Sequence, residues 1–349
     1  MVRSSLVAAT ALIVGCARLG IGPATTPSVA TVERTRSLLA ALSDDSMLGR
    51  RVATAGEARA ARFIAARFRE AGLEAGGDSG YFQRLTLVNT TTRTRSASGQ
   101  ERVRSGLNML TGADLDTVPP ERRVRAVNVL GVLRGSDPAL RSEVVIVGAH
   151  FDHLGIRPAV DGDSIANGAD DDASGVVAVI EAARIMAAGP RPKRTIVFAA
   201  FTGEESGGFG VRWYADHPIV PLDRHVADLQ VEMIGRPDTA AGGPGKTELT
   251  GFERSTMGST LVAAGLAVKP DPRPEMQFFV RSDNIVFARL GIVAHTLSSY
   301  GMHDDYHTVN DEWDRVDFPH MTEVVNLIAR AVRTIADGPR LEWNPGGKP

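Results

Sequence analysis

The stretch Val144-Val145-Ile146-Val147-Gly148-Ala149-His150-Phe151-Asp152 is a continuous apolar run that ends in a histidine and an acid. A short β-branched run without alternation is typical of a strand that is covered on both faces. Strand and helix patterns alternate on both sides of this run, which is typical of a mostly parallel sheet. Ligands bind beyond the carboxyl ends of strands in such sheets, so we predict a polar site at the end of this strand.

The predicted fold class is α/β, a three-layer sandwich with a mostly parallel central sheet and helices on both faces. Strands are predicted over 127–133, 144–149, 195–201, 227–232, 277–279 and 292–296. Helices are predicted over 174–188, 208–217, 255–264, 284–290 and 321–336. Upstream of these, periodicity predicts helices over 32–42 and 57–71 and a strand over 82–88.

The chain of 349 residues is long enough for one large core, and we predict a single domain over 31–340. The polar, Thr- and Arg-rich stretch 89–125 is predicted to be an irregular insertion near the start of this domain, which could hold a hairpin or a cap. The formal net charge is −2, which gives no reason to expect a nucleic acid as partner.

The start of the chain has the features of a secretory leader. Arg3 precedes a short apolar run, and a small residue, Gly15, stands before Cys16, the one cysteine of the chain. This arrangement resembles a bacterial lipoprotein box, which would make residues 1–16 a signal peptide with a lipidated Cys16 and residues 17–30 a tether. The alternative is an ordinary signal peptide. We therefore expect an exported protein that is lipid-anchored in the bacterial cell envelope, or otherwise periplasmic or secreted.

Side chains that can bind metals follow several of the predicted strands. They are His150 and Asp152, the acids Asp170, Asp171 and Asp172, the pair Glu204 and Glu205, then Glu232 and finally His307. Imidazoles and carboxylates without cysteine suit a pair of zinc-like cations that share one bridging carboxylate. Three of these groups come directly after strands, so we expect them to converge at one edge of the sheet.

Each part of this set also has a structural interpretation. The acids before the helix 174–188 could be stabilised by its dipole, and His150 could be a buried histidine paired with a carboxylate. Glu204 and Glu205 could form a solvated turn, and Glu232 could pair with Arg236. The metal interpretation accounts for all parts together. It also leaves one acid of the glutamate pair free to move a proton.

Other hydrolytic chemistries fit the sequence poorly. No G-x-S-x-G motif is present, and Ser282-Asp283-Asn284 has no S-x-x-K partner. The single cysteine lies in the leader, which excludes a thiol nucleophile. His303 and His307 are four residues apart, but Asp304 stands where helical zinc-protease motifs have Glu, so His307 alone is expected to bind metal.

At this point the ordered set resembles the co-catalytic dizinc aminopeptidases, whose superfamily also includes glutamate carboxypeptidase, transferrin receptor and glutaminyl cyclase. The stretches that carry the resemblance are VGAHFDHLG (147–155), NGADDDASG (167–175), FTGEESGG (201–208) and YHTVND (306–311). The resemblance implies the zinc exopeptidase fold. The sequence departs from the family pattern at three positions, where it has Glu232, Asn284 and Glu312 in place of the more frequent Asp, His and Thr. His150 argues against the glutaminyl cyclase branch, which lacks that ligand.

The resemblance also implies roles for these residues. Asp171 would bridge the two metals across a cis bond to Asp172. One metal would add His150 and Glu232, and the other Glu205 and His307; Glu204 would be the general base, and Asp152 would orient His150. The residues that would contact the substrate are Tyr300, His303, Ser282 and Asp283. The cofactors would be two Zn²⁺ per chain, with Mn²⁺ or Co²⁺ possible.

The implied function is hydrolysis of the N-terminal peptide bond of peptides by a water between the metals. A carboxypeptidase or amide hydrolase with the same site is an alternative, for which Arg281 could hold a carboxylate. A catalytically inactive binding protein on the same fold is another. The expected partners are peptides, with no nucleic acid, and with the membrane only through Cys16. The sequence does not fix the oligomeric state.

Overall fold

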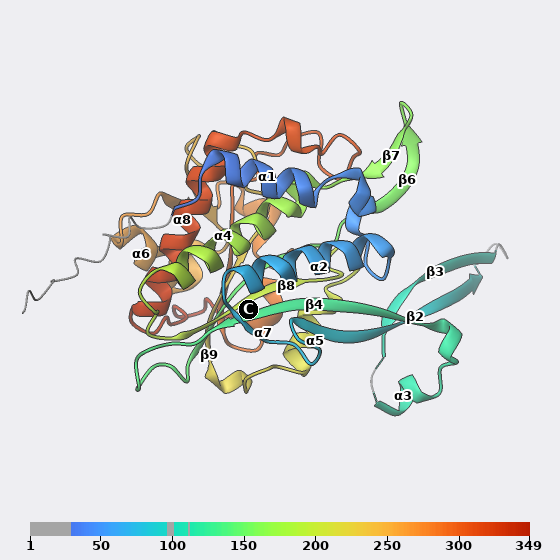
Figure 1. Cartoon of the computed structure of the whole chain (residues 1–349), viewed down its shortest axis with the longest axis horizontal. Helices are drawn as coiled ribbons and strands as arrows, with labels where there is room; N and C mark the ends of the chain where they lie inside the picture. The colour runs from blue at the N-terminus through green and yellow to red at the C-terminus, as the bar shows by residue number, and fades with distance from the viewer. Residues whose placement is uncertain (1–28, 96–100, 111) are drawn as a thin grey trace, which may run out of the picture.

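The computed structural model describes residues 29–95, 101–110 and 112–349. A ten-stranded sheet lies at its centre, in the order β11-β10-β12-β9-β5-β8-β4-β2-β3, with β1 beside β4 (Figure 1). Its strands are β1 (Glu74–Ala75), β2 (Phe82–Arg95), β3 (Glu101–Met109), β4 (Arg123–Leu133), β5 (Val144–His150), β8 (Thr195–Phe201), β9 (His225–Val231), β10 (Thr247–Leu249), β11 (Val268–Pro270) and β12 (Val293–Ser298). A separate hairpin of β6 (Gly155–Val160) and β7 (Asp163–Ala166) projects from one end.

The middle of the sheet is parallel. Strand β5 runs parallel to both β8 and β9, and β9 runs parallel to β12. Strand β4 pairs antiparallel with β8, and β2 pairs antiparallel with both β4 and β3. The predicted α/β class is confirmed, and the sheet as a whole is mixed because antiparallel strands flank its parallel centre. The carboxyl ends of β5, β8, β9 and β12 therefore lie at one edge.

Helices cover both faces of the sheet. One face carries α1 (Val32–Leu42), α2 (Ala55–Glu70), α4 (Gly175–Ala188) and α8 (Phe318–Asp337), which lie nearest the viewer in Figure 1. The other face carries α5 (Phe209–Asp216) and α7 (Asn284–Arg289), while α6 (Thr256–Ala263) and α3 (Gly112–Asp116) lie farther out. Along β5, Val145 and Val147 belong to the first core and Val144 and Ile146 to the second. This two-sided burial explains the unbroken apolar run.

Most of the predicted elements are present with small shifts at their ends. The helix over 32–42 and the strand over 195–201 have the predicted bounds, and α8 begins three residues before its predicted start. Asp317 caps α8 by accepting the main-chain N–H of His320 at 3.0 Å, and this cap fixes the helix start. The predicted strand over 277–279 is wrong, since 3₁₀ turns occupy Pro274–Met276 and Phe278–Val280.

The stretch 89–125 contributes to a hairpin, one of the two alternatives that the sequence left open. Much of it forms the long hairpin of β2 and β3, which extends the sheet, and α3 and the start of β4 follow. The leader, Cys16 and most of the tether lie outside the described residues. Within the described ranges, no helix combines the length and apolarity needed to cross a membrane.

Candidate metal centre

The predicted ligands meet at the carboxyl edge of the parallel strands. His150 is the last residue of β5, Glu204 and Glu205 follow β8, and Glu232 follows β9. The loop after β12 brings His307 to the same place, and the loop before α4 brings Asp171. Four segments that are distant in sequence thus place their side chains around one carboxylate, that of Asp171.

The first group of potential ligands is His150, Asp171 and Glu232, each of which offers one atom to a common point. The Nε2 atom of His150 lies 3.2 Å from Oδ1 of Asp171 and 3.8 Å from Oε1 of Glu232. This nitrogen is buried and has no hydrogen-bond partner in the described part of the chain. A buried nitrogen that faces two carboxylates fits a bound cation.

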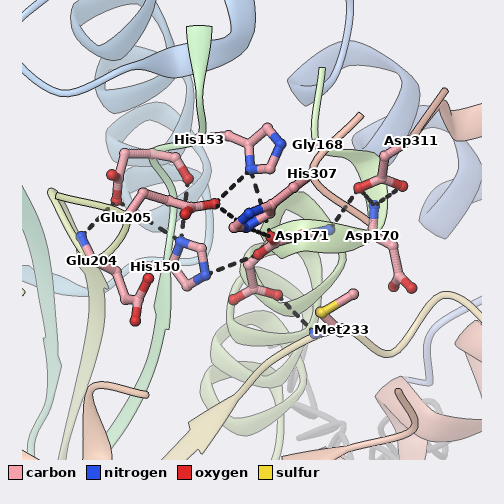
Figure 2. Close-up of polar contacts among 12 residues, drawn as sticks. His150, His153, Gly168, Asp170, Asp171, Glu204, Glu205, Met233, His307 and Asp311 are labelled. Carbon is pink, nitrogen blue, oxygen red and sulfur yellow. Dashed lines mark hydrogen bonds and ion pairs between the residues drawn. The ribbon is translucent and has the colours of Figure 1, made fainter. Parts of the chain in front are cut away.

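The second group uses the other oxygen of Asp171. The Nε2 atom of His307 lies 3.0 Å from Oδ2 of Asp171 and 3.1 Å from Oε1 of Glu205 (Figure 2). His153 points into the same group, with Nδ1 2.9 Å from Oε1 of Glu205. Because each oxygen of Asp171 faces a different group, its carboxylate is placed to bridge two cations. Nitrogen and oxygen donors of this kind suit zinc.

The charges of these groups compensate one another without a cation. Although burial alone would raise it, contacts with His150 and His307 hold the pKa of Asp171 well below its usual range. Burial opposes protonation of His307, yet the contacts with Asp171 and Glu205 raise its pKa to about 9. Protons therefore occupy positions that a metal ion would compete for, and metal binding should release protons.

The neighbouring acids hold the loop that carries Asp171. Asp311 accepts the main-chain N–H groups of Asp170 and Asp171, each at 3.0 Å (Figure 2). Asp172 accepts the N–H of Gly175 at 2.9 Å and that of Met233 at 3.1 Å. The bond between Asp171 and Asp172 is cis, as the resemblance implied. These contacts tie the loop to the segments that carry the other ligands.

A buried arginine ties together two of the ligand-bearing segments. Arg50 donates to the main-chain oxygens of Phe151 and Gly168, both at 2.8 Å, and also to those of Leu42 and Asn167. Phe151 follows His150 directly, and Gly168 begins the acidic loop. Arg50 is 0% exposed, so four carbonyl groups satisfy its guanidinium in place of water.

The contact that orients His150 differs from the expected one. Its Nδ1 atom lies 3.2 Å from the main-chain oxygen of Asp152, and the carboxylate is more distant, at 3.8 Å. The Asp152 carboxylate instead accepts the main-chain N–H of Glu204 at 3.0 Å. Asp152 therefore orients His150 through its carbonyl group, and it positions the glutamate pair through its side chain.

Glu204 belongs to neither group of potential ligands. Burial raises its pKa well above the usual range, and the nearby acids Glu232, Asp283 and Asp152 add to the effect, while His150 opposes it. A carboxyl group with a raised pKa, beside two potential cation sites, can act as a general acid or base. Glu232 does not pair with Arg236, which instead contacts Asp305 at 2.8 Å.

A cavity of about 500 Å³, including its open mouth, adjoins the first group. It is lined by Glu232, Met233, Glu248, Thr250, Phe278, Arg281, Thr296, Ser298, Tyr300 and Tyr306. Tyr300, one of the four predicted substrate-binding residues, lines this cavity. His303 contacts Asp170 at 3.0 Å instead, and Ser282 and Asp283 are buried outside the cavity lining.

Three residues near the metal groups were missed from the sequence: His153, Arg50 and Asp311. His153 lies three residues after His150, and a second histidine directly after a strand end was the available signal. Asp311 stands in the YHTVND stretch that carried the resemblance. Arg50 gives no such signal, because its partners are main-chain carbonyl groups far along the chain.

Comparisons with known proteins agree with this geometry. The sequence model of "Peptidase family M28" matches residues 128–332, well over half of the chain. A "probable zinc metalloprotease" of the fungus Leptosphaeria maculans is 41% identical over 92 residues, which cover 26% of this chain and 20% of that protein. One of Pyrenophora teres f. teres is 38% identical over 112 residues, 32% of this chain and 23% of that protein. The matched part is thus about a fifth to a quarter of these relatives.

Solved structures share the fold at low sequence identity. An aminopeptidase from Aneurinibacillus sp. strain AM-1 superposes with a TM-score of 0.61 at 16% identity, covering 90% of this chain and 96% of its own. A zinc aminopeptidase from Bacillus subtilis gives 0.62 at 15% identity, covering 88% and 96%. A glutaminyl cyclase from Porphyromonas gingivalis gives 0.55 at 17%, covering 86% and 97%. These likenesses show the fold.

Proposed function

The chain belongs to peptidase family M28, and from this premise we propose that it is a zinc-dependent aminopeptidase that holds two metal ions. The coarser statement, a zinc metallopeptidase, is supported by the family and by the names of its relatives. The observation that carries the finer proposal is the carboxylate of Asp171, whose two oxygens each face a separate group of donors. Mn²⁺ or Co²⁺ could replace zinc at nitrogen and oxygen donors.

His150 and Glu232 would hold one ion, His307 and Glu205 would hold the other, and Asp171 would join both. When bound, such a pair polarises a carbonyl group and makes water more acidic. The chain itself supplies the proton transfer. Glu204 is held beside the ligands by its main-chain bond to Asp152, and it would take the proton of the attacking water and pass it to the leaving amine.

The cavity beside Glu232 would receive the substrate residue next to the cleaved bond. Aromatic side chains of Phe278, Tyr300 and Tyr306 line it, and Glu232 and Glu248 contribute carboxylates. Carboxylates can hold the free amino group that defines an aminopeptidase substrate. Arg281 also lines the cavity and could hold a carboxylate, so a carboxypeptidase is the second candidate.

The central test is Glu204→Gln. This variant keeps the shape of the side chain and the ligand sets but loses the group that moves the proton. We expect two metal ions per chain, as in the unchanged protein, with kcat lowered about 10²–10⁴-fold. The control is Glu121→Gln, an exposed acid far from the site. Turnover of Glu204→Gln within a few fold of the unchanged enzyme would refute the assignment.

A substrate panel separates the two exopeptidase candidates. Aminoacyl chromogenic substrates should be cleaved, and peptides with a blocked amino terminus should not. Cleavage of blocked peptides from their carboxyl end would favour the carboxypeptidase. An inactive binding protein on this fold would hold less than one metal per chain, which elemental analysis of the purified protein measures.

We also propose that the protein is exported and anchored through lipid on Cys16. The support is the order of charge, apolar run and small residue before that cysteine. Peptides would be its partners, and no nucleic acid is expected at a net charge of −2. Mass spectrometry of the mature amino terminus tests this: an unmodified terminus other than Cys16 would contradict the lipid anchor.

A further inference from the structure

His153 has no side-chain hydrogen bond within the described residues that explains its buried position. It lies on the loop after β5, and its side chain is 0% exposed. Among the residues that the structure describes, neither Nδ1 nor Nε2 has a hydrogen-bond partner. An unpaired buried imidazole nitrogen costs free energy comparable to a lost hydrogen bond, so native structures rarely leave one without a partner. The surroundings of His153 should therefore supply its ring nitrogens with a partner other than a hydrogen-bonding group.

The ring is held so that Nδ1 faces the second group of ligands. A Cβ atom at Gly168, where φ is +57°, would lie 2.4 Å from Cγ of His153, so only glycine leaves room for the ring. The ring of His307 lies edge-on to it, at 5.7 Å between centroids. The Nδ1 atom is 2.9 Å from Oε1 of Glu205 and 3.7 Å from Oδ2 of Asp171, yet neither approach forms a hydrogen bond (Figure 2).

The distances among the four donor atoms match the edges of a coordination tetrahedron. Zinc bonds to nitrogen and oxygen of about 2.0–2.1 Å give edges of about 3.3 Å. In the structure these edges are 2.9 and 3.7 Å from Nδ1 of His153 and 3.0 and 3.1 Å from Nε2 of His307, each to Asp171 or Glu205. They fall on both sides of the ideal edge, as expected of four side chains around one ion.

We propose that His153 is a fourth protein ligand of the metal site formed by Asp171, Glu205 and His307. This inference rests on the proposed metallopeptidase function and goes beyond its five ligands. It makes the two sites unequal. Four protein donors close a tetrahedral site, whereas the site of His150, Asp171 and Glu232 has three and keeps an open position. The exchangeable coordination position would then belong to the site of His150 and Glu232.

The first test replaces His153 with alanine and titrates metal-free protein with Co²⁺ and Zn²⁺ against a competing chelator. Loss of an outer contact of a ligand typically costs about 10–100-fold in affinity. A direct ligand should cost more than about 100-fold at one of the two sites, with the other site nearly unchanged. The control is His217→Ala, which removes an exposed histidine stacked on Trp213 far from the ligands.

The second test replaces His153 with cysteine in a chain that also carries Cys16→Ser. The sulfur lies closer to the backbone than Nδ1, but the longer zinc–sulfur bond of about 2.3 Å makes up part of the difference. A thiolate on Co²⁺ gives an intense near-ultraviolet charge-transfer band. We expect this band to grow with one equivalent of Co²⁺ and to be absent from the Cys16→Ser parent.

The outcomes separate the proposals. A charge-transfer band, or loss of more than about 100-fold at one site of folded His153→Ala, supports the assignment. A smaller loss without the band overturns it and makes His153 an outer partner of Glu205. Unchanged affinity at both sites also overturns it. If the unchanged protein binds no metal, the proposed function itself fails, and that result is visible before any variant is made.

Discussion

Replacing Arg50 with methionine removes the cation that joins two ligand-bearing segments. The guanidinium is fully buried, and it donates to four main-chain oxygens: those of Leu42, Phe151, Asn167 and Gly168. Methionine has a similar apolar length but no donor. All four carbonyl groups would lose that donor in a part of the protein that water does not reach, and this loss destabilises the folded state.

The expected magnitude follows from the contacts. Hydrogen bonds to a charged group contribute about 1.5–3 kcal/mol each, and four bonds at the lower part of this range give about 6–8 kcal/mol. Against this stands the cost of burying the charge. Burial lowers the pKa of Arg50 to about 10 despite the nearby acids, and the difference from 12.5 corresponds to about 3 kcal/mol. The variant should therefore lose about 3–5 kcal/mol of unfolding free energy.

Urea unfolding of the metal-free protein measures this loss without a contribution from bound metal. The control is Arg62→Met, which alters an exposed arginine on α2. Since Phe151 adjoins His150 and Gly168 begins the loop of Asp171, metal affinity should fall in Arg50→Met as well. A free energy of unfolding within about 1 kcal/mol of the unchanged protein would refute the reasoning, because it would mean that the four carbonyls find other donors.

Two further predictions concern other buried polar groups. Asp311→Asn weakens the acceptor for the N–H groups of Asp170 and Asp171, so metal affinity should fall about 10–100-fold in a chelator competition; equal affinity would contradict this. Burial lowers the pKa of His295 to about 4, so the unfolded chain takes up a proton near pH 6.5 and the folded chain does not. The free energy of unfolding should therefore fall by about 3 kcal/mol as the pH is lowered from 6.5 toward 4. Urea unfolding of His295→Gln should show a pH dependence without this contribution.

The central strands could be predicted because burial on both faces leaves a plain signal. Strand β8 has the predicted bounds, and alternate residues of its apolar run enter the two cores. The strand predicted over 277–279 is wrong because it was inferred from residue type alone. Phe278 and Phe279 favour a strand by residue type, but Gln277 adopts φ +55°, and Phe279 packs on His295 and Trp343 from a 3₁₀ turn. Aromatic residues there indicate burial, which tertiary contacts can satisfy without a sheet.

The ligand set could be predicted where chemistry follows a strand end. His150, Glu205 and Glu232 each come within a few residues of a parallel strand, and topology brings such positions together. His153 also lies within a few residues of the end of β5, but the histidine ligand at this strand end was assigned to His150 and a second one was not considered. Arg50 could not be predicted from the sequence, because its partners are main-chain carbonyl groups. Every residue has such a group, so no residue type identifies the partners of Arg50.

The run of three aspartates shows what decides between a metal ligand and a structural acid. Asp170 is committed to the N–H of Gly235 at 2.6 Å and to His303, and Asp172 accepts two main-chain N–H groups. The carboxylate of Asp171, between the other two, contacts the imidazoles of His150, His153 and His307, which can become neutral and bind the same cations. Residue type is identical at the three positions, so the assignment of Asp171 depends on which carboxylate faces both His150 and His307.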